Sequence, residues 1–334
     1  MNFIFKRDES LNKFLEGKTI LITGGSGSFG NKMVETLLTN YKPTKVIVYS
    51  RDEYKQSLMQ QKFPHEKYPQ LRLFIGDVRD YDRFLLASKN VNIIFHAAAL
   101  KQVPVLEYNP SEAIETNING TKKVIRAAIA NGVERMMAIS TDKCVEPVNL
   151  YGATKLCMEK LMMAANSYSG KDGTKFSVAR YGNVFGSRGS VVPIFMKQLE
   201  SKVLTITDPT MTRFTVTLQD AINFVLNCLL IMNGREVFIP RLPSYNIMQI
   251  AKIIGPDCEY KIIGMRPGEK LHELMFGKYE SYLTKKYDNY YIISPKNEKN
   301  ENSMEEYCSG NNEMISDDLL RQIYIAYVNS NDVH

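Results

Sequence analysis

Short apolar runs alternate with helically spaced apolar residues along the first half of the chain. The apolar, β-rich runs predict strands at 18–23, 45–50, 71–75, 91–96, 135–140 and 176–180. Apolar residues at helical spacing predict helices at 29–38, 81–88, 111–131 and 151–168. This alternation predicts an α/β fold, a Rossmann-type doubly wound parallel sheet, over residues 17–185.

After Asn183 the pattern loosens into Gly, Ser, Pro and Arg with shorter elements. We expect residues 186–295 to form mainly a smaller C-terminal substrate-binding lobe, with some return to the core. Residues 1–16 form an N-terminal arm, which is either a short amphipathic helix or a loose segment.

The last part of the chain, residues 296–334, is predicted to be a polar loop followed by a helix. Residues 296–315 are rich in Asn, Glu and Lys and poor in apolar residues, which is typical of a loop or a disordered stretch. Ser316-Asp-Asp then caps a predicted amphipathic helix at 319–328.

A glycine-rich run joins the first predicted strand to the first predicted helix. Its sequence is Thr23-Gly24-Gly25-Ser26-Gly27-Ser28-Phe29-Gly30. Gly24 permits a tight turn, Gly27 lets the backbone approach a phosphate, and Gly30 lets the helix pack close to the strand. The amides at the helix N-terminus then bind a pyrophosphate. The context predicts a dinucleotide site rather than a chance glycine-rich turn.

The end of the second predicted strand bears on the choice between NAD and NADP. An NAD site usually places an acid there for the ribose 2′-hydroxyl, whereas NADP needs a cation for its 2′-phosphate. Ser50 and Arg51 suit a phosphate, and Lys55 adds a positive charge one turn later. Asp52 leaves the alternative open because it can pair with Arg51 or Lys55. We favour NADP.

Composition narrows the class of protein. The 334 residues carry a net charge of +6 without a basic stripe, which suits an anionic ligand such as a nucleotide and predicts no nucleic-acid partner. The five cysteines include no Cys-x-x-Cys pair and predict free thiols in a reducing compartment. His272-Glu273 lacks the second histidine of a zinc helix, so no metal site is expected. No apolar run is long enough to span a bilayer and no signal-peptide pattern is present, so we expect a cytoplasmic protein without a membrane partner.

Proton-transfer groups follow the fifth and precede the sixth predicted strand. Tyr151 and Lys155 are spaced to share one face of a helix. A phenol with a pKa near 10 is a poor base, but a neighbouring ammonium and a nicotinamide cation lower that pKa. Tyr151 is therefore a candidate base for a sugar hydroxyl that is being oxidised, with Thr141 as a hydrogen-bond partner of the same hydroxyl. An exposed tyrosine near a solvated lysine is the alternative interpretation.

Six motifs together resemble the extended short-chain dehydrogenase/reductases. They are the glycine-rich loop, His96-Ala-Ala-Ala-Leu-Lys101, Ser140-Thr-Asp-Lys, Tyr151-x-x-x-Lys155, Arg180-Tyr-Gly-Asn183-Val and Arg266-Pro-Gly-Glu269-Lys. Within that group the chain most resembles the inverting UDP-N-acetylglucosamine 4,6-dehydratases, from about residue 17 to 295. The branch-specific phrases are Tyr49-Ser-Arg-Asp-Glu, Pro147-Val-Asn-Leu-Tyr-Gly-Ala-Thr-Lys and Gly186-Ser-Arg-Gly-Ser-Val-Val-Pro.

This resemblance implies an NADP-dependent hydro-lyase of nucleotide-sugar and surface-glycan biosynthesis. C4 oxidation, water elimination across C5 and C6, and C6 reduction with recycled NADP would convert UDP-N-acetylglucosamine to UDP-2-acetamido-2,6-dideoxy-β-L-arabino-hex-4-ulose. It also implies a homo-oligomer, a dimer or a hexamer.

The residues after Thr141 carry the finer assignment. Dehydratases that keep the C5 configuration are expected to have Asp-Glu here, and simple epimerases lack a matching acid–base pair. The chain has Asp142-Lys143, as in the inverting branch. Lys143 suits the base for the C5 proton if burial lowers its pKa, and Asp142 suits the acid for the C6 hydroxyl if its pKa is raised. A surface lysine is the alternative interpretation of Lys143.

The resemblance and the glycine-rich context also assign binding residues. The cofactor residues are Gly24, Ser26, Gly27, Ser28, Phe29, Gly30, Ser50, Arg51, Asp52, Lys55, Asp77, Val78, Ala97, Ala98, Lys101, Tyr151, Lys155 and Val184. The substrate residues are Lys101, Asn183, Arg188, Val191, Arg213, Arg266 and Glu269. Arginine suits a diphosphate because its planar fork binds two oxygens at once. His96 and Cys144 are expected to pack in the core.

Two other functions stay open. A UDP-sugar epimerase or reductase on the same scaffold is favoured if Lys143 is a bystander. A non-catalytic NADP-binding module would be expected to lack Tyr151 or Lys155, and both are present.

Overall fold

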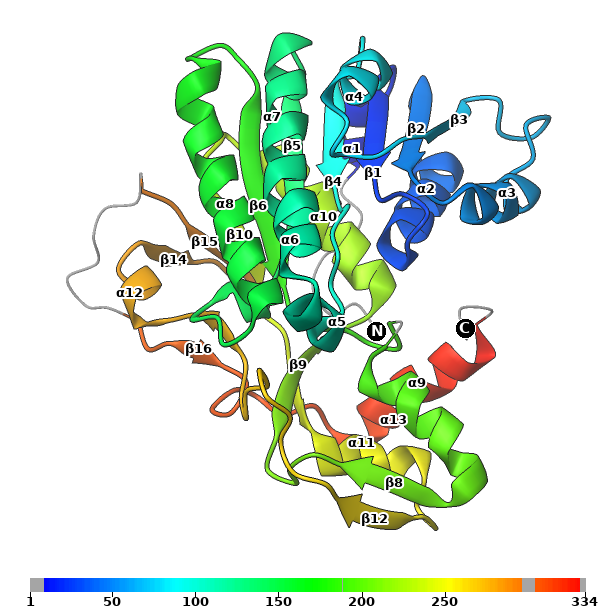
Figure 1. Cartoon of the computed structure of the whole chain (residues 1–334), viewed down its shortest axis with the longest axis vertical. Coiled ribbons are helices and arrows are strands. Elements are labelled where there is room, and N and C mark those ends of the chain that lie inside the picture. Colours follow the sequence, from blue (N-terminus) through cyan, green and yellow to red (C-terminus); the bar gives the residue numbers. More distant parts are fainter. Residues whose placement is uncertain (1–8, 188, 296–303, 331–334) are drawn as a thin grey trace.

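A central sheet with helices on both faces organises the computed structural model, which describes residues 9–187, 189–295 and 304–330 (Figure 1). In spatial order its strands within this part of the chain are β14 (Thr284–Lys286), β15 (Tyr290–Ile293), β10 (Val237–Pro240), β6 (Lys175–Tyr181), β5 (Arg135–Thr141), β4 (Ile93–His96), β1 (Thr19–Thr23), β2 (Lys45–Ser50) and β3 (Leu71–Ile75). Strands β3 to β10 in this order are parallel, whereas β15 and β14 continue antiparallel. The predicted α/β, doubly wound fold class is confirmed.

The apolar strand sequences follow from burial on both faces of the sheet. Ile20, Leu21 and Ile22 are all completely buried, as expected where helices cover both sides. The register places Thr23 beside His96, and His96 beside Ala138. The loops after β1, β4 and β5 therefore leave the sheet at the same carboxyl edge, where ligands of such sheets bind.

The helices pack in two groups. On one face α4 contacts α7 and α7 contacts α8, and on the other α10 contacts both α1 and α2 (Figure 1). The helix bounds are α1 (Ser10–Leu15), α2 (Ser28–Asn40), α3 (Glu53–Lys62), α4 (Tyr81–Ala87), α5 (Val103–Tyr108), α6 (Pro110–Ala113), α7 (Gly120–Ala130), α8 (Leu150–Ser169), α9 (Val191–Gln198), α10 (Leu218–Ile231), α11 (Ile247–Ile254), α12 (Lys278–Ser281) and α13 (Asp317–Asn329). Two short 3₁₀ helices are η2 (Asp142–Cys144) and η3 (Leu199–Ser201).

The helix predicted at 111–131 is one helical run with a change of winding. A π-helical turn, η1 (Ile114–Asn119), separates α6 from α7. Within it the Asn117 side chain donates to the Leu100 carbonyl and to Thr154 Oγ1, and accepts from the Leu100 amide. Such turns often occur at functional sites. Here the turn joins the loop after β4 to α8.

A smaller lobe has its own core and lies at the bottom of Figure 1. Its strands are β7 (Asn183–Val184), β9 (Thr212–Val216) and β11 (Ser244–Asn246) in one sheet, and β8 (Val203–Ile206) with β12 (Glu259–Ile262) in another. Phe195, Leu204, Ile250 and Leu320 are among its buried residues. The chain leaves this lobe to add α10, β10, β14 and β15 to the main layers.

Residues 304–315 form an ordered loop, the first of the two predicted alternatives, with one two-residue strand. Strand β16 (Tyr307–Cys308) pairs with β13 (Leu274–Phe276), and Ser309 is completely buried. The polar composition did not indicate that Tyr307 and Ile315 within this loop are buried. Residues 296–303 of the predicted loop lie outside the described residues.

The structure also bears on the predictions for the C-terminal helix and the N-terminal arm. Ser316 Oγ accepts from the Leu319 amide, so the predicted cap and final helix are confirmed, with α13 beginning at Asp317. Of the two alternatives for the N-terminal arm, residues 10–15 form the short helix, which buries Leu11 and Leu15. Residues 1–8 lie outside the described residues.

Tyr307→Phe should lower the free energy of unfolding by about 1–3 kcal/mol, because a buried amide loses its acceptor. The Tyr307 hydroxyl accepts from the Leu242 amide at 2.7 Å and donates to the Leu242 carbonyl at 2.9 Å. Urea unfolding measures the change, with the exposed Tyr279→Phe as the control. Equal stability of the two variants would contradict an anchoring role for Tyr307.

Candidate active site

A cavity of about 1030 Å³ opens at the carboxyl edge of the sheet, between the sheet and the smaller lobe. The described residues predicted to bind cofactor or substrate or to transfer protons all line it, with one exception. The exception is Lys155, which lies behind the wall and is almost completely buried. Arg188 lies outside the described residues. The structure thus brings together residues that are far apart in the sequence.

The glycine-rich loop forms a cradle that side chains would fill. Gly24 has a φ of +66°, and a Cβ there would lie 2.9 Å from the backbone of Ala98. A Cβ at Gly30 would lie 2.3 Å from the backbone of Gly25. Helix α2 begins at Ser28 with Gly27 as its N-cap, so its first amides lie at the cavity. This arrangement fits a pyrophosphate.

The groups after β2 form two separate ion pairs. Lys55 Nζ lies 2.6 Å from Asp52 Oδ2, and Asp52 also caps α3 by accepting from the Lys55 amide. Arg51 instead lies near Asp77, with 3.6 Å between Nη1 and Oδ2, and half of its side chain is exposed. Asp52 thus pairs with Lys55, and Asp77 pairs with Arg51. The guanidinium of Arg51 remains half exposed at the cavity.

Asp77 and Ser50 are also engaged by the protein. Asp77 accepts from the amide and the side chain of Arg79 and does not cap α4, a role taken by Asp80. Ser50 Oγ accepts from Gln56 Nε2 at 2.9 Å.

The predicted acid–base pair lies where β5 ends. Thr141 Oγ1 donates to Asp142 Oδ1 at 2.8 Å and accepts from the Lys143 amide at 3.3 Å. Lys143 Nζ lies 3.1 Å from the same Asp142 oxygen and 3.3 Å from Asn183 Oδ1. Asn183, which the sequence assigned to substrate, therefore also contacts the predicted base.

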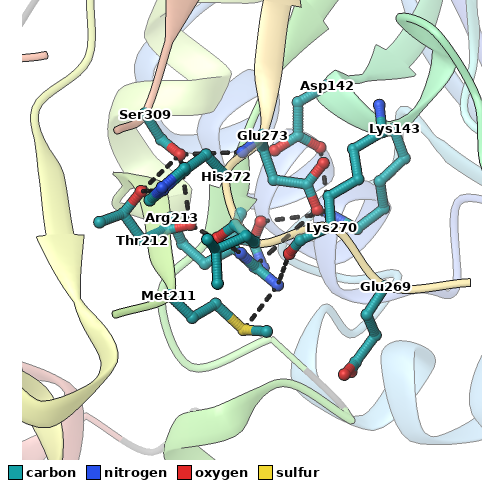
Figure 2. A network of polar contacts seen from close by, with 12 residues as sticks. Asp142, Lys143, Met211, Thr212, Arg213, Glu269, Lys270, His272, Glu273 and Ser309 are labelled. Atoms are coloured by element: carbon teal, nitrogen blue, oxygen red, sulfur yellow. Dashed lines mark hydrogen bonds and ion pairs between the residues drawn. The ribbon is translucent and has the colours of Figure 1, made fainter. Parts of the chain in front are cut away.

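Glu273 is a site residue that the sequence analysis missed. Its Oε1 lies 3.3 Å from Lys143 Nζ and 3.8 Å from Arg213 Nε, and its side chain is buried. Figure 2 shows these side chains in one polar network, with Glu269 pointing away from it. The available signal was weak: an acid directly precedes the apolar run Leu274-Met275-Phe276, where burial of a charge requires a partner.

Burial and charge act on the pKa values of this network in different directions. Burial raises the pKa of Asp142, although Lys143 opposes the rise. Burial alone would lower the pKa of Lys143, but the carboxylates of Asp142 and Glu273 raise it above its usual range. The condition under which Lys143 would suit the C5 base, a pKa lowered by burial, is therefore not met by the protein chain itself, because the two carboxylates outweigh burial.

Tyr151 and Lys155 lie one turn apart near the start of α8. Asn149 Oδ1 caps this helix by accepting from the Gly152 amide, which fixes where the turn begins. Lys155 Nζ donates to the Ile139 carbonyl at 2.6 Å, and burial lowers the pKa of Lys155 to about 8. Burial raises the pKa of Tyr151 to about 12, with Lys143 as the largest opposing influence. Within the chain, Lys143 rather than Lys155 therefore favours the phenolate.

Two core predictions are confirmed. His96 bridges Thr23 and Thr121 through its two ring nitrogens, and burial lowers the pKa of His96 to about 3. Cys144 is completely buried and donates to Glu159 Oε1 at 3.1 Å.

The predicted substrate residues lie on the wall nearer the smaller lobe. Arg213 donates to the carbonyls of Thr212, Lys270 and Leu271. Arg266 and Glu269 form an exposed ion pair, with 2.5 Å between Nη2 and Oε1. Their contacts with a diphosphate stay predictions.

In the ranges that the structure describes, no helix combines the length and the apolar character needed to cross a membrane.

Comparison with known proteins identifies the family. The model of the family described as polysaccharide biosynthesis protein matches residues 20–295. An inverting UDP-N-acetylglucosamine 4,6-dehydratase of Campylobacter jejuni is 54% identical over 281 residues, covering 84% of this chain and 83% of that protein. A UDP-glucose 4-epimerase of Rickettsia bellii is 43% identical over 284 residues, covering 83% and 82%. The X-ray structure of Pen from Bacillus thuringiensis is 37% identical, with a TM-score of 0.87, and the match covers 94% of this chain and 99% of that one.

These matches confirm the resemblance inferred from the motifs: the chain belongs to the polysaccharide biosynthesis protein family, which it shares with the inverting UDP-N-acetylglucosamine 4,6-dehydratases.

Proposed function

We propose that this chain is a UDP-N-acetylglucosamine 4,6-dehydratase that inverts C5 and acts in nucleotide-sugar and surface-glycan biosynthesis. The observation that carries the proposal is the contact of 3.1 Å between Asp142 Oδ1 and Lys143 Nζ on the wall that also holds Tyr151. Elimination of water needs an acid and a base within reach of neighbouring carbons. The identity of 54% with the Campylobacter jejuni dehydratase supports the same reaction.

The size of the cavity supports two ligands. Its volume of about 1030 Å³ is at the top of the range of about 300–1,000 Å³ typical of small-molecule sites. We infer that residues 17–185 mainly hold the cofactor and that residues 186–295 mainly hold the sugar nucleotide. For the latter we retain Lys101, Asn183, Arg188, Val191, Arg213, Arg266 and Glu269.

The first half of the reaction oxidises C4. When bound, a nicotinamide cofactor supplies the hydride acceptor for C4 and the hydride donor for C6. Tyr151 accepts the proton of the C4 hydroxyl, and Thr141 Oγ1 hydrogen-bonds the same oxygen. Since burial raises the pKa of Tyr151 to about 12, the phenolate needs positive charge nearby, and Lys143 provides the largest such influence within the chain.

The second half removes water. The C4 ketone makes the C5 proton acidic, and Lys143 removes it. Asp142 protonates the departing C6 hydroxyl, a role that suits a carboxyl whose pKa burial has raised. After reduction at C6, a solvent-derived proton added to C5 on the face opposite to the one that lost its proton gives UDP-2-acetamido-2,6-dideoxy-β-L-arabino-hex-4-ulose.

We infer that the cofactor is NADP. Asp52 is held by Lys55, while Arg51 has half of its side chain exposed at the cavity and only a long contact to Asp77. This leaves a guanidinium for the 2′-phosphate and occupies the acid that would otherwise accept a 2′-hydroxyl. We also expect a cytoplasmic homo-oligomer, a dimer or a hexamer.

A UDP-sugar 4-epimerase is the second candidate, because the Rickettsia bellii relative is 43% identical over a similar part of the chain. Epimerisation requires C4 oxidation and reduction but no acid–base pair at C5 and C6. The contact between Asp142 and Lys143 therefore favours the dehydratase. The presence of both Tyr151 and Lys155 weighs against a non-catalytic module.

Incubation with UDP-N-acetylglucosamine should give a product lighter by one water, and no reduced cofactor should accumulate because the hydride from C4 returns to C6. Mass spectrometry, proton NMR and nicotinamide absorbance measure these outcomes. Reduced cofactor that grows in step with product would indicate a net dehydrogenase. A product of unchanged mass with inverted C4 would indicate an epimerase.

Arg51→Ala should weaken NADP binding by about 1–3 kcal/mol, the range of a hydrogen bond to a charged group, and NAD binding far less. Calorimetric titration with each cofactor measures the difference. Lys89→Ala, an exposed cation outside the cavity, is the control. An equal loss for the two cofactors would show that Arg51 does not bind the 2′-phosphate.

Tyr151→Phe should abolish every step, including solvent deuterium entry at C5, because it removes the base for C4 oxidation. Lys143→Ala should still oxidise C4 but should not remove the C5 proton. Rapid mixing of excess Lys143→Ala enzyme with substrate should therefore show nicotinamide reduction without loss of water. Product formation by this variant at a near-normal rate would rule out Lys143 as the C5 base.

A further inference from the structure

Glu273 is a buried carboxylate next to the acid–base pair, and the reaction as described gives it no role. Its Oε1 contacts Lys143 at 3.3 Å, and its Oε2 has no hydrogen-bond partner among the described residues. The backbone is fixed from both sides, since Ser309 donates to the Glu273 carbonyl and accepts from the Glu273 amide, each at 2.9 Å. The backbone of Glu273 is therefore anchored, and its carboxylate lies beside Lys143.

Three side-chain oxygens surround the ammonium group of Lys143. Asp142 Oδ1 lies 3.1 Å from Nζ, and Asn183 Oδ1 and Glu273 Oε1 each lie 3.3 Å from it. An ammonium so bonded has no lone pair with which to remove a proton. To act as a base, Lys143 must first pass one proton to a neighbour, and Asp142 and Glu273 are the two carboxylates within reach.

The surroundings distinguish these two carboxylates. Arg213 Nε lies 3.8 Å from Glu273, and the positive charges of Lys143, Arg213 and Lys270 hold the pKa of Glu273 below its usual range despite burial. Burial raises the pKa of Asp142, and the negative charge of Glu273 adds to this rise. Asp142 Oδ2 is also buried without a hydrogen-bond partner among the described residues. Asp142 is therefore the better proton acceptor.

We propose that Glu273 is a positioning residue for proton transfer at C5: it holds the Nζ of Lys143 and directs the proton of that ammonium onto Asp142. The proton moves from Lys143 Nζ to Asp142 Oδ1 along the existing contact of 3.1 Å. One transfer thus yields both the neutral amine that removes the C5 proton and the carboxylic acid that protonates the C6 hydroxyl. The net charge of the network does not change. This inference rests on the proposed dehydratase function.

The C-terminal segment supports residues of the active-site wall on this view. Ser309 Oγ also contacts Thr212 Oγ1 at 2.8 Å, and Thr212 Oγ1 contacts His272 Nδ1 at 2.7 Å (Figure 2). These contacts join the segment to the residues beside Arg213 and Glu273. The family match ends at residue 295, so a residue beyond it anchors the backbone that carries the Glu273 carboxylate.

The expected pH effect follows from the charged groups that face Lys143. These are Asp142, Glu273 and Arg213, with Lys270 next to Glu273 and the phenols of Tyr151 and Tyr245 close by. Glu273→Gln keeps the size and an acceptor oxygen but removes one negative charge. The Asp142–Lys143 pair then binds its protons less tightly, so its apparent pKa values move down by about 1–3 pH units.

The first experiment titrates Lys143 without relying on activity. Competitive labelling with acetic anhydride, read by mass spectrometry against the other lysines, follows the neutral amine in the full-length protein. At a fixed pH below the pKa, Lys143 should label at least about 10 times faster in Glu273→Gln, because one pH unit changes the neutral fraction tenfold. Labelling at the wild-type rate would overturn the proposal whether or not the chain is a dehydratase.

The second experiment measures water elimination from UDP-N-acetylglucosamine against pH. In Glu273→Gln both limbs of the profile should move to lower pH by about 1–3 units. Glu273→Asp retains the charge and should keep the wild-type limbs at a reduced rate. The control Glu313→Gln removes an exposed carboxylate from the C-terminal segment and should change nothing.

The outcomes separate the two proposals. Faster labelling of Lys143 together with shifted limbs supports the role of Glu273. A lower rate with unmoved limbs would show a merely structural residue and would overturn the inference while the dehydratase stands. Absence of dehydration in the wild type would refute the proposed function, and the labelling result would then still decide whether Glu273 controls the charge of Lys143.

Discussion

The buried guanidinium of Arg180 joins the elements that carry the proton-transfer residues. From β6 it bonds to both carboxylate oxygens of Glu159 on α8, to the Met275 carbonyl on β13 and to Glu280 on α12. Helix α8 carries Tyr151 and Lys155, and Glu273 lies just before β13. Removing one partner of such a pair would leave an uncompensated buried charge, which typically destabilises a protein by about 3–5 kcal/mol. The spacing of the active-site wall thus depends on this interaction.

The sheet and the residues that follow its strands could be predicted because each is encoded by a few residues that are adjacent in the sequence. Ile20–Ile22 are apolar because helices cover both faces of β1, and this requirement is visible in three residues. Gly24 and Gly30 could also be recognised from a short pattern, because no side chain fits at either position. Tyr151 and Lys155 followed from helical spacing, although Lys155 contacts the Ile139 carbonyl and does not line the cavity.

Long-range contacts were not predictable in this way. Glu273 meets Lys143 only because β13 passes beside η2, and no spacing rule connects them. The direction of the Lys143 pKa could not be predicted for the same reason, because it depends partly on a carboxylate that the sequence does not place there. The burial of Tyr307 and Ser309 was not predicted because the segment around them is polar. Composition describes the average of a segment, whereas burial differs from residue to residue.

Charge balance explains why an inverting site requires more than a change at one position. A lysine after Asp142, where a retaining dehydratase is expected to have an acid, adds a positive charge to a wall that already contains Arg213. Ion pairs link Asp142 to Lys143, Lys143 to Glu273 and Glu273 to Arg213, and Lys270 adds a further positive charge near Glu273. Without Glu273, Asp142 would face Lys143 without the second carboxylate that helps to raise the pKa of Asp142, and it would hold its proton poorly. On the proposed mechanism, the base for C5 and the acid for C6 therefore depend on a third residue that touches neither carbon.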